Sequence, residues 1–309
     1  MKIIVSVGVC LRNCESSVKS IVDRISSQDF PHKNIEVLFV EEGSKDDTLS
    51  LLKKNAPRMN MPYKIIHQEW KGLGFSRNVI FQNSKGKYIV WVDDGTIIPK
   101  DYIRKQIIFM EEHPAVGIAM GVIGIYSGSN LVSNLENMGE LVFSYNYAGK
   151  VTTKLPGTGG SIYRTKAMKQ VNGFDEQITG ATEDTDIAYR ILSAGWQIWI
   201  TNTKYFVDHN KKLRTIWSKS LWYGYGSHFT LNKHKELHTK LYKSTPIAGF
   251  LQGIFICFTA YKLTHKKTAF LLPFYILIKR TAFCLGFLRG HIDSYGHVKK
   301  NVCRAIKIK

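Results

Sequence analysis

Short apolar runs alternate with stretches of helical periodicity through the first 95 residues, and this alternation constrains the fold more than any other feature. The apolar runs lie at residues 2–9, 35–44, 63–69 and 87–95. The stretches between them, with apolar side chains near helical spacing, lie at residues 16–28, 46–56 and 74–84. Strands that are apolar on both faces and separated by helices are typical of a parallel sheet covered on both sides. The sequence therefore predicts an α/β fold with a mostly parallel sheet flanked by helices.

Charged side chains follow the predicted strands at their carboxyl ends. Arg12 follows the first strand, Glu41 and Glu42 end the second, and Asp93 and Asp94 end the fourth. In open α/β sheets, ligands bind outside the carboxyl ends of the strands. Carboxylates gathered there repel one another unless a cation lies among them, and hard oxygen ligands suit Mg²⁺ or Mn²⁺. We therefore expect a divalent metal at this edge of the sheet.

Several classes of protein are disfavoured by motifs that the sequence lacks. The stretch KGLGFSRN at residues 71–78 contains only G-x-G, and no GK[ST] motif occurs, which argues against a nicotinamide enzyme or a P-loop kinase. The five cysteines form no C-x-x-C pair, which favours reduced, cytosolic thiols over a disulfide framework or a zinc site. The apolar N-terminal run, cut by Arg12, is interpreted as a strand and not as a secretory signal.

Positive charge is concentrated in the C-terminal third of the chain. Residues 1–203 hold 23 Lys and Arg against 21 Asp and Glu, whereas residues 204–309 hold 20 basic and 3 acidic residues. Such a basic segment suits a phosphate-rich partner, either nucleic acid or an anionic membrane surface. Because no RNA-binding signature occurs and apolar runs lie among the lysines, no nucleic acid is expected and a membrane surface is favoured.

Two apolar runs lie within this basic segment. Residues 244–261 contain no charge, and their eighteen residues are at the edge of transmembrane length. The second run, residues 268–278, is followed by Lys279 and Arg280 and is predicted to be too short to span. If the first run crossed the membrane outward, the three lysines between the runs would lie on its outer side, whereas such charges are usually found on the cytoplasmic side. We therefore favour helices lying in the cytoplasmic interface of the cell membrane; one or two membrane spans, and burial in a soluble helical domain, are the alternatives.

Three sequence blocks then occur in a fixed order. They are VEEGSKDDT at residues 40–48, KGLGFSRN…YIVWVDDGTIIP at residues 71–99, and GTGGSIYR…NGFDE…TEDTDIAYR…GW at residues 157–196. Together they resemble the inverting family 2 glycosyltransferases of the GT-A fold, over about residues 3–215. The resemblance implies a GT-A (Rossmann-like) catalytic domain at residues 1–215, with a mixed, mostly parallel sheet. The charge distribution and the apolar runs predict that a basic, apolar, membrane-associated helical region follows at residues 216–309.

The resemblance also implies an activity and a set of donor-binding residues. The enzyme would move a sugar from a nucleoside diphosphate sugar to a hydroxyl of a glycan or lipid-linked glycan, inverting the anomeric centre. Asp94 and His209 would ligate Mg²⁺ or Mn²⁺, although the usual second aspartate of the family motif falls on Gly95 here. The nucleotide sugar would be held by Arg12, Glu41, Glu42, Arg77, Asp93, Lys211 and Arg214.

The third block carries the predicted acid–base chemistry. Asp184 corresponds to the family's general base, and Glu183 would orient the acceptor, with Gly159 and Gly160 on the acceptor side. The alternative is that Glu183 and Asp184 have a structural role only, because acids at a helix N-terminus interact favourably with the helix dipole. This block favours a hydroxyl acceptor over a polyprenyl phosphate. A polyprenyl-phosphate glycosyltransferase, and a non-catalytic sugar-nucleotide-binding module with a degenerate metal motif at Gly95, are the alternatives.

Overall fold

The computed structural model describes residues 2–126, 128, 130–208, 212–237 and 244–296. Within these residues one mixed sheet has the strand order β3-β2-β1-β4-β8-β6-β9-β5, with β7 paired to β9. Strands β3, β2, β1 and β4 are parallel, and β8 is antiparallel to its neighbours β4 and β6. The strands are β1 Val5–Leu11, β2 Ile35–Glu41, β3 Tyr63–His67, β4 Tyr88–Trp91, β5 Thr96–Ile97, β6 Val116–Ile123, β7 Lys150–Val151, β8 Ser161–Arg164 and β9 Gln197–Val207.

Helices cover both faces of this sheet, as the continuous hydrophobicity of its strands predicts. Alternate residues of β2 belong to two cores: Val37 and Phe39 pack with α1, α2 and α4, whereas Leu38 and Val40 pack with α3, α6 and α7. The α/β, mostly parallel fold is therefore confirmed. These helices are α1 Glu15–Ser26, α2 Thr48–Asn55, α3 Leu73–Asn83, α4 Tyr102–Glu112, α6 Thr165–Gln170 and α7 Glu183–Ser193.

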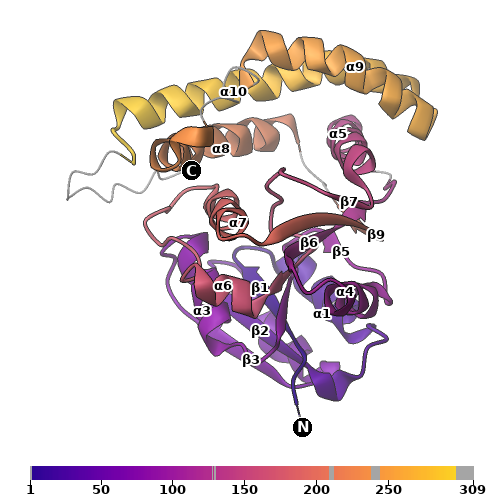
Figure 1. The fold of residues 1–309 in the computed structure, drawn as a ribbon, viewed down its shortest axis with the longest axis vertical. Helices are drawn as coiled ribbons and strands as arrows, with labels where there is room; N and C mark the ends of the chain where they lie inside the picture. The colour runs from indigo at the N-terminus through magenta and orange to yellow at the C-terminus, as the bar shows by residue number, and fades with distance from the viewer. Residues whose placement is uncertain (1, 127, 129, 209–211, 238–243, 297–309) are drawn as a thin grey trace.

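Four further helices form a layer over one end of the sheet. They are α5 Leu131–Tyr147, α8 Leu213–Lys233, α9 Pro246–Thr264 and α10 Leu272–Ile292. Figure 1 shows α9 and α10 (orange to yellow) running together across the top of the molecule, with α8 beneath them. A third apolar core, which includes Leu135 of α5, Ile216 of α8 and Cys257 of α9, joins this layer together.

Glycines set the close approach of these helices. A Cβ atom placed on Gly224 of α8 would lie 1.9 Å from the carbonyl oxygen of Phe283, and one on Gly286 of α10 would lie 2.0 Å from that of Leu221. The α8 and α10 backbones are therefore in direct contact, which only residues without a side chain allow.

Gly286→Ala is expected to lower the free energy of unfolding by about 1–3 kcal/mol, because the added methyl group collides with backbone and not with a mobile side chain. Gly139→Ala in α5 is the matched control, since a Cβ atom there meets nothing within 4 Å. This control should be neutral or stabilising by up to about 1 kcal/mol. Thermal unfolding of the purified variants checks both; equal stability of the two variants would contradict the proposed α8–α10 contact.

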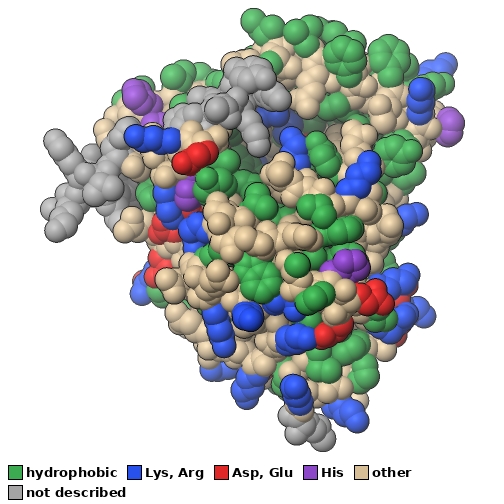
Figure 2. Space-filling model, viewed as in Figure 1, with side chains coloured by type: hydrophobic (Ala, Val, Ile, Leu, Met, Phe, Trp, Pro, Cys, Tyr) green, Lys and Arg blue, Asp and Glu red, His purple; other side chains and the backbone are tan. Residues whose placement is uncertain are grey.

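The prediction that the second apolar run is too short to span is wrong. Helix α10 continues through Lys279 and Arg280, and both side chains line a cavity beneath the helix. Two helical segments, Pro246–Thr264 and Lys267–Ile292, are long and apolar enough to cross a membrane. Their outer faces carry exposed apolar side chains such as Phe255 (78%) and Ile292 (80%), and Figure 2 shows hydrophobic side chains gathered along this end of the molecule.

Candidate functional site

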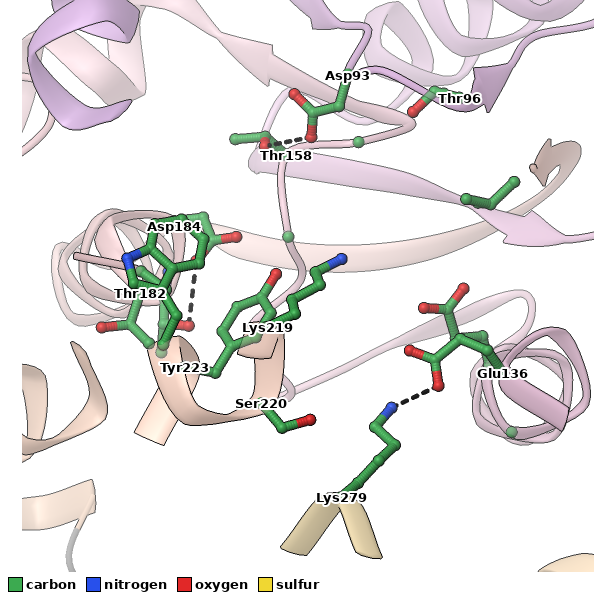
Figure 3. A pocket seen from close by; sticks show the side chains of 18 of the residues that line it. Asp93, Thr96, Glu136, Thr158, Thr182, Asp184, Lys219, Ser220, Tyr223 and Lys279 are labelled. Atoms are coloured by element: carbon green, nitrogen blue, oxygen red, sulfur yellow. Dashed lines mark hydrogen bonds and ion pairs between the residues drawn. The ribbon is translucent and has the colours of Figure 1, made fainter. Parts of the chain in front are cut away.

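A cavity of about 990 Å³ lies between the carboxyl ends of the central strands and the C-terminal helix layer. At the sheet end its walls carry six carboxylates, those of Glu42, Asp93, Asp94, Glu183, Asp184 and Asp208. At the opposite end they are formed by α5, α8, α9 and α10 (Figure 3). The predicted strand-end acids therefore meet in one place, although they come from segments far apart in the sequence.

The two neighbouring glutamates at the end of β2 are placed differently. Glu41 accepts a hydrogen bond from the backbone N–H of Ser44 (2.7 Å) and is paired with Nδ1 of His67 (2.6 Å), so both its oxygens are occupied outside the cavity. Glu42 lines the cavity, and its buried Oε1 has no hydrogen-bond partner within the described residues. Burial raises the pKa of Glu42 to about 7. Both glutamates were predicted to hold the nucleotide sugar, but only Glu42 lines the cavity.

Two arginines near this end have distinct surroundings. The Arg12 guanidinium lies over the Trp70 ring, 4.7 Å from its centroid, and both side chains line the cavity. Arg77 is buried and pairs with the carboxylates of Glu183 and Asp93, the latter at 3.4 Å. The Arg77 guanidinium therefore ties α3 to the start of α7 and to the end of β4. Its predicted contact with a nucleotide stays a prediction, and the geometry gives it a positioning role as well.

The Asp184 carboxylate lines the cavity from the first turn of α7. Burial raises the pKa of Asp184 above its ordinary value, and the charge of Arg77 opposes this effect. The preceding residue Glu183 is buried and paired with Arg77, so its carboxylate is less available to a ligand than that of Asp184. A half-buried carboxylate with a raised pKa is suited to accepting a proton.

The backbone before Asp184 is held in a strained conformation. Thr182 has φ +84°, a value that β-branched residues rarely adopt. Its hydroxyl is hydrogen-bonded to that of Thr230 of α8 at 2.6 Å. Gly226 of α8 lets the two backbones touch, since a Cβ atom there would lie 2.0 Å from the carbonyl oxygen of Ala181. Helix α8 therefore fixes the position from which Asp184 projects.

Only one of the two predicted acceptor-side glycines lines the cavity. A Cβ atom on Gly159 would lie 3.1 Å from Oδ2 of Asp93, so this glycine keeps the carboxylate accessible. Gly160 lies outside the lining, and its carbonyl oxygen accepts a hydrogen bond from the Tyr102 hydroxyl (2.5 Å). Asp93 itself accepts a hydrogen bond from the hydroxyl of Thr158 at 3.1 Å (Figure 3).

Of the two predicted metal ligands, Asp94 and His209, only Asp94 lies within the described residues. His209 and Lys211 lie outside the described residues, and Arg214 is exposed in the first turn of α8, away from the cavity lining. Asp94 and Asp208 both line the cavity, and the β4–β5 turn joins them through a hydrogen bond from the Asp208 N–H to the Gly95 carbonyl (2.8 Å). Among the described residues no group of three His, Cys, Asp or Glu side chains is close enough to hold a metal. The exposed Asp94 and the half-buried Asp208 offer carboxylate oxygens, which suit Mg²⁺ or Mn²⁺ where a ligand's own phosphate oxygens complete the shell.

Comparison with known families identifies the chain. The model of the family described as "Glycosyl transferase family 2" matches residues 6–171, which include both strand-end acid pairs and the Gly-rich stretch. The chain belongs to glycosyl transferase family 2. It is therefore a glycosyltransferase, as its sequence blocks predict.

Relatives of this family 2 glycosyltransferase include the poly(ribitol-phosphate) beta-N-acetylglucosaminyltransferase TarS of Staphylococcus aureus, 29% identical over 108 residues, which are 35% of this chain and 19% of TarS. The succinoglycan biosynthesis protein ExoA of Rhizobium meliloti is 24% identical over 252 residues, which are 74% of this chain and 70% of ExoA. The chain thus spans about a fifth of the length of TarS and most of the length of ExoA.

Solved structures confirm the GT-A fold of the glycosyltransferase. The mannosyltransferase PcManGT of Pyrobaculum calidifontis, in complex with GDP-Man and Mn²⁺, has a TM-score of 0.68 at 15% identity and covers 95% of this chain and 88% of its own. A fragment of Staphylococcus aureus TarS in complex with UDP has a TM-score of 0.54 at 17% identity and covers 95% of this chain and 92% of its own.

A buried ion network holds α7 of the glycosyltransferase against α8. The Asp186 carboxylate pairs with Arg190 (2.6 Å), as the i, i+4 spacing predicts. It also pairs with Lys233 (2.7 Å), the last residue of α8, and with His234 (2.8 Å), which caps that helix. Burial acts to raise the pKa of Asp186, but hydrogen bonds from His234 and the neighbouring cations lower it far below its usual range.

Asp186→Asn is expected to lower the free energy of unfolding at neutral pH by about 2 kcal/mol. The loss should be smaller than for a fully buried ion pair, because Lys233 and Arg190 are partly exposed to solvent. A depressed folded-state pKa stabilises the protein above the unfolded pKa, and this contribution is lost as the pH falls. The difference between wild type and variant should therefore shrink below about pH 4. Denaturant unfolding across pH measures it, and a difference independent of pH would refute the ionic origin.

Sequence reasoning missed several residues of this glycosyltransferase's cavity. Thr158 lies within the Gly-rich stretch and could have been found there, because a hydroxyl beside glycines often contacts a ligand or a carboxylate. The cavity residues contributed by α5, α8 and α10 belong to no recognisable sequence motif. They include Glu136, Lys219, Tyr223, Lys279 and Arg280.

Proposed function

We propose that this glycosyltransferase transfers a sugar from a nucleoside diphosphate donor to a hydroxyl of a glycan or lipid-linked glycan, with inversion at the anomeric carbon. The observation that carries the proposal is that Asp184 lines the same cavity as Glu42, Asp93 and Asp94. A proton acceptor and a donor-binding edge therefore share one cavity, which a direct, single displacement needs.

The donor is assigned to the sheet end of the cavity. Glu42 accepts a hydrogen bond from an N–H of the nucleotide base, because its buried Oε1 has no partner within the described residues. Trp70, braced by Arg12, offers a ring face on which the base can stack. Asp93, oriented by Arg77 and Thr158, accepts from the ribose hydroxyls.

The leaving diphosphate is assigned to the region of Asp94. Asp94 and Asp208 would hold Mg²⁺ or Mn²⁺, and such an ion supplies charge stabilisation to the departing nucleoside diphosphate. Lys211 and Arg214 stay predicted donor contacts and His209 a predicted metal ligand, although Arg214 lies in the first turn of α8, outside the cavity lining.

The acceptor hydroxyl is assigned to Asp184. Its carboxylate takes the proton of the attacking hydroxyl, which is a poor nucleophile while protonated. The raised pKa of Asp184 makes it a stronger base than an exposed aspartate. Glu183 and Arg77 hold α7 in place, and Gly159 leaves room for the sugar beside Asp93.

We also propose that the molecule lies on the cytoplasmic face of a membrane. Helix α10 is fixed to α8 through Gly224 and Gly286, so spanning would separate backbones that are in contact. The outward faces of α9 and α10 are apolar, and the surrounding segment is basic, which suits an anionic lipid surface.

A screen of the purified full chain against nucleotide sugars, read by released nucleoside diphosphate, tests the proposed function. We expect Mn²⁺-supported release from one donor, and faster release when a lipid-linked sugar is added. Bare lipid phosphate as a better acceptor than lipid-linked sugar would identify a polyprenyl-phosphate glycosyltransferase instead. No release from any donor would favour a non-catalytic binding protein.

A further inference from the structure

The half of the cavity farthest from the sheet carries positive charge from the helix layer. Lys219 projects from α8, and Lys279 and Arg280 project from α10. In Figure 3, Lys219 and Tyr223 stand between Asp184 on one side and the Glu136–Lys279 pair on the other. The proposed base and these cations therefore face the same cavity.

Two of these three cations lack an opposing carboxylate. Lys279 is paired with Glu136 at 2.5 Å, and Tyr275 donates to the same oxygen at 2.7 Å. Lys219 contacts only a ring face, that of Tyr223 at 5.6 Å, within the described part of the chain. Arg280 has no hydrogen bond or ion pair among those same residues, although it is half-buried. Partly desolvated cations that have no carboxylate partner are suited to binding an anionic ligand.

The Arg280 side chain is also held in place by its neighbours. A Cβ atom on Gly249 of α9 would lie 2.6 Å from Cγ of Arg280, so the aliphatic stem packs directly on the α9 backbone. Glu136 and Glu140 of α5 line the same cavity, so negative charge lies on the α5 side of these cations. An arginine whose aliphatic chain is fixed by packing, and whose guanidinium has no protein partner among the described residues, is suited to bidentate contact with phosphate oxygens.

We propose that Lys219 and Arg280, supported by Lys279, bind the phosphate group of a lipid carrier to which the acceptor sugar is attached. This inference rests on the proposed function, because it places the acceptor hydroxyl at Asp184 and the carrier's phosphate at the α8–α10 end of the same cavity. Lys279 and Arg280 lie on the inner side of α10, whose outer side is apolar, so a lipid tail can leave the cavity toward the membrane-facing helices.

Binding of farnesyl diphosphate to the full chain in non-ionic detergent, measured by titration calorimetry, tests the subsite. We expect Arg280→Gln to weaken binding by roughly tenfold or more, because a charge-assisted bidentate contact is lost. Lys219→Gln should shift binding in the same direction, and it keeps the test valid if Arg280→Gln does not fold. Arg289→Gln is the matched control: the same residue type on the same helix, outside the cavity lining and 64% exposed.

Further ligands separate the possible sources of the phosphate. Inorganic pyrophosphate should bind wild type more weakly than farnesyl diphosphate, and farnesol should bind wild type and both variants alike. Equal affinity for pyrophosphate and farnesyl diphosphate would assign the cations to a free phosphate and overturn the lipid carrier. Unchanged farnesyl diphosphate affinity in both folded variants would overturn the subsite. Failure of the proposed function is read separately, as an absence of donor turnover by wild type.

Discussion

Asp184→Asn is expected to lower the rate of sugar transfer by roughly 10²–10⁴-fold while leaving donor affinity nearly unchanged. The amide has almost the shape of the carboxylate but cannot accept the proton of the attacking hydroxyl. The Asp184 side chain is not part of the Arg77 ion pair, so the variant keeps the buried contacts that hold α7. Steady-state transfer to lipid-linked sugar, together with nucleotide binding, separates kcat from donor affinity.

The pH dependence of wild type gives a second measurement of the same group. Because Asp184 acts deprotonated, kcat/KM should fall as the pH falls through its pKa. Burial raises this pKa, so the acidic limb should lie above the ordinary aspartate value of about 3.9.

Asp23→Asn is the control for this variant, since Asp23 lies exposed on α1 and should leave transfer unchanged. Full transfer activity in Asp184→Asn would mean that the acceptor is already ionised. That result would favour a polyprenyl phosphate over a hydroxyl as the attacking group.

Much of the sheet end of the site was predictable because its residues are local to strand ends. Glu42, Asp93 and Asp94 follow apolar runs directly, and the carboxyl ends of parallel strands must meet at one edge. The sequence could not distinguish Glu41 from Glu42, since adjacent residues at a strand end point to opposite sides and only tertiary contacts decide which side is the cavity. The Glu41 carboxylate is hydrogen-bonded to His67 and to the backbone of Ser44, whereas the Glu42 carboxylate lines the cavity.

The long-range contacts around the site and its helix end were not predictable, because they join distant segments without a motif. Arg77 pairs with Glu183, 106 residues away, and Asp186 pairs with His234, 48 residues away. Lys279 and Arg280 were interpreted as a break in an apolar run. Only the packing of α10 on α8 shows that such charges can face a cavity inside a continuous helix.

Asp94→Asn is expected to lower Mn²⁺-supported donor turnover by about 10²-fold or more, because the charge that would hold the ion at the diphosphate is removed. Asp94 is suited to this test because no hydrogen bond or ion pair within the described residues involves its carboxylate, so the substitution should leave the fold intact. Asp93→Asn would be a poorer test, since it also disturbs Arg77 and Thr158. A chelator should reduce wild-type turnover to a similar level.

Restoring Mn²⁺ distinguishes the ion's site from a general loss of activity. Added Mn²⁺ should recover wild type and Asp23→Asn fully, whereas Asp94→Asn should need a much higher concentration. Asp208→Asn should shift the Mn²⁺ requirement in the same direction, because Asp208 lines the same part of the cavity. If chelation leaves wild type fully active and Asp94→Asn matches it, then Gly95 marks a motif that no longer binds metal. The charge of the departing diphosphate would then have to be met by protein cations alone.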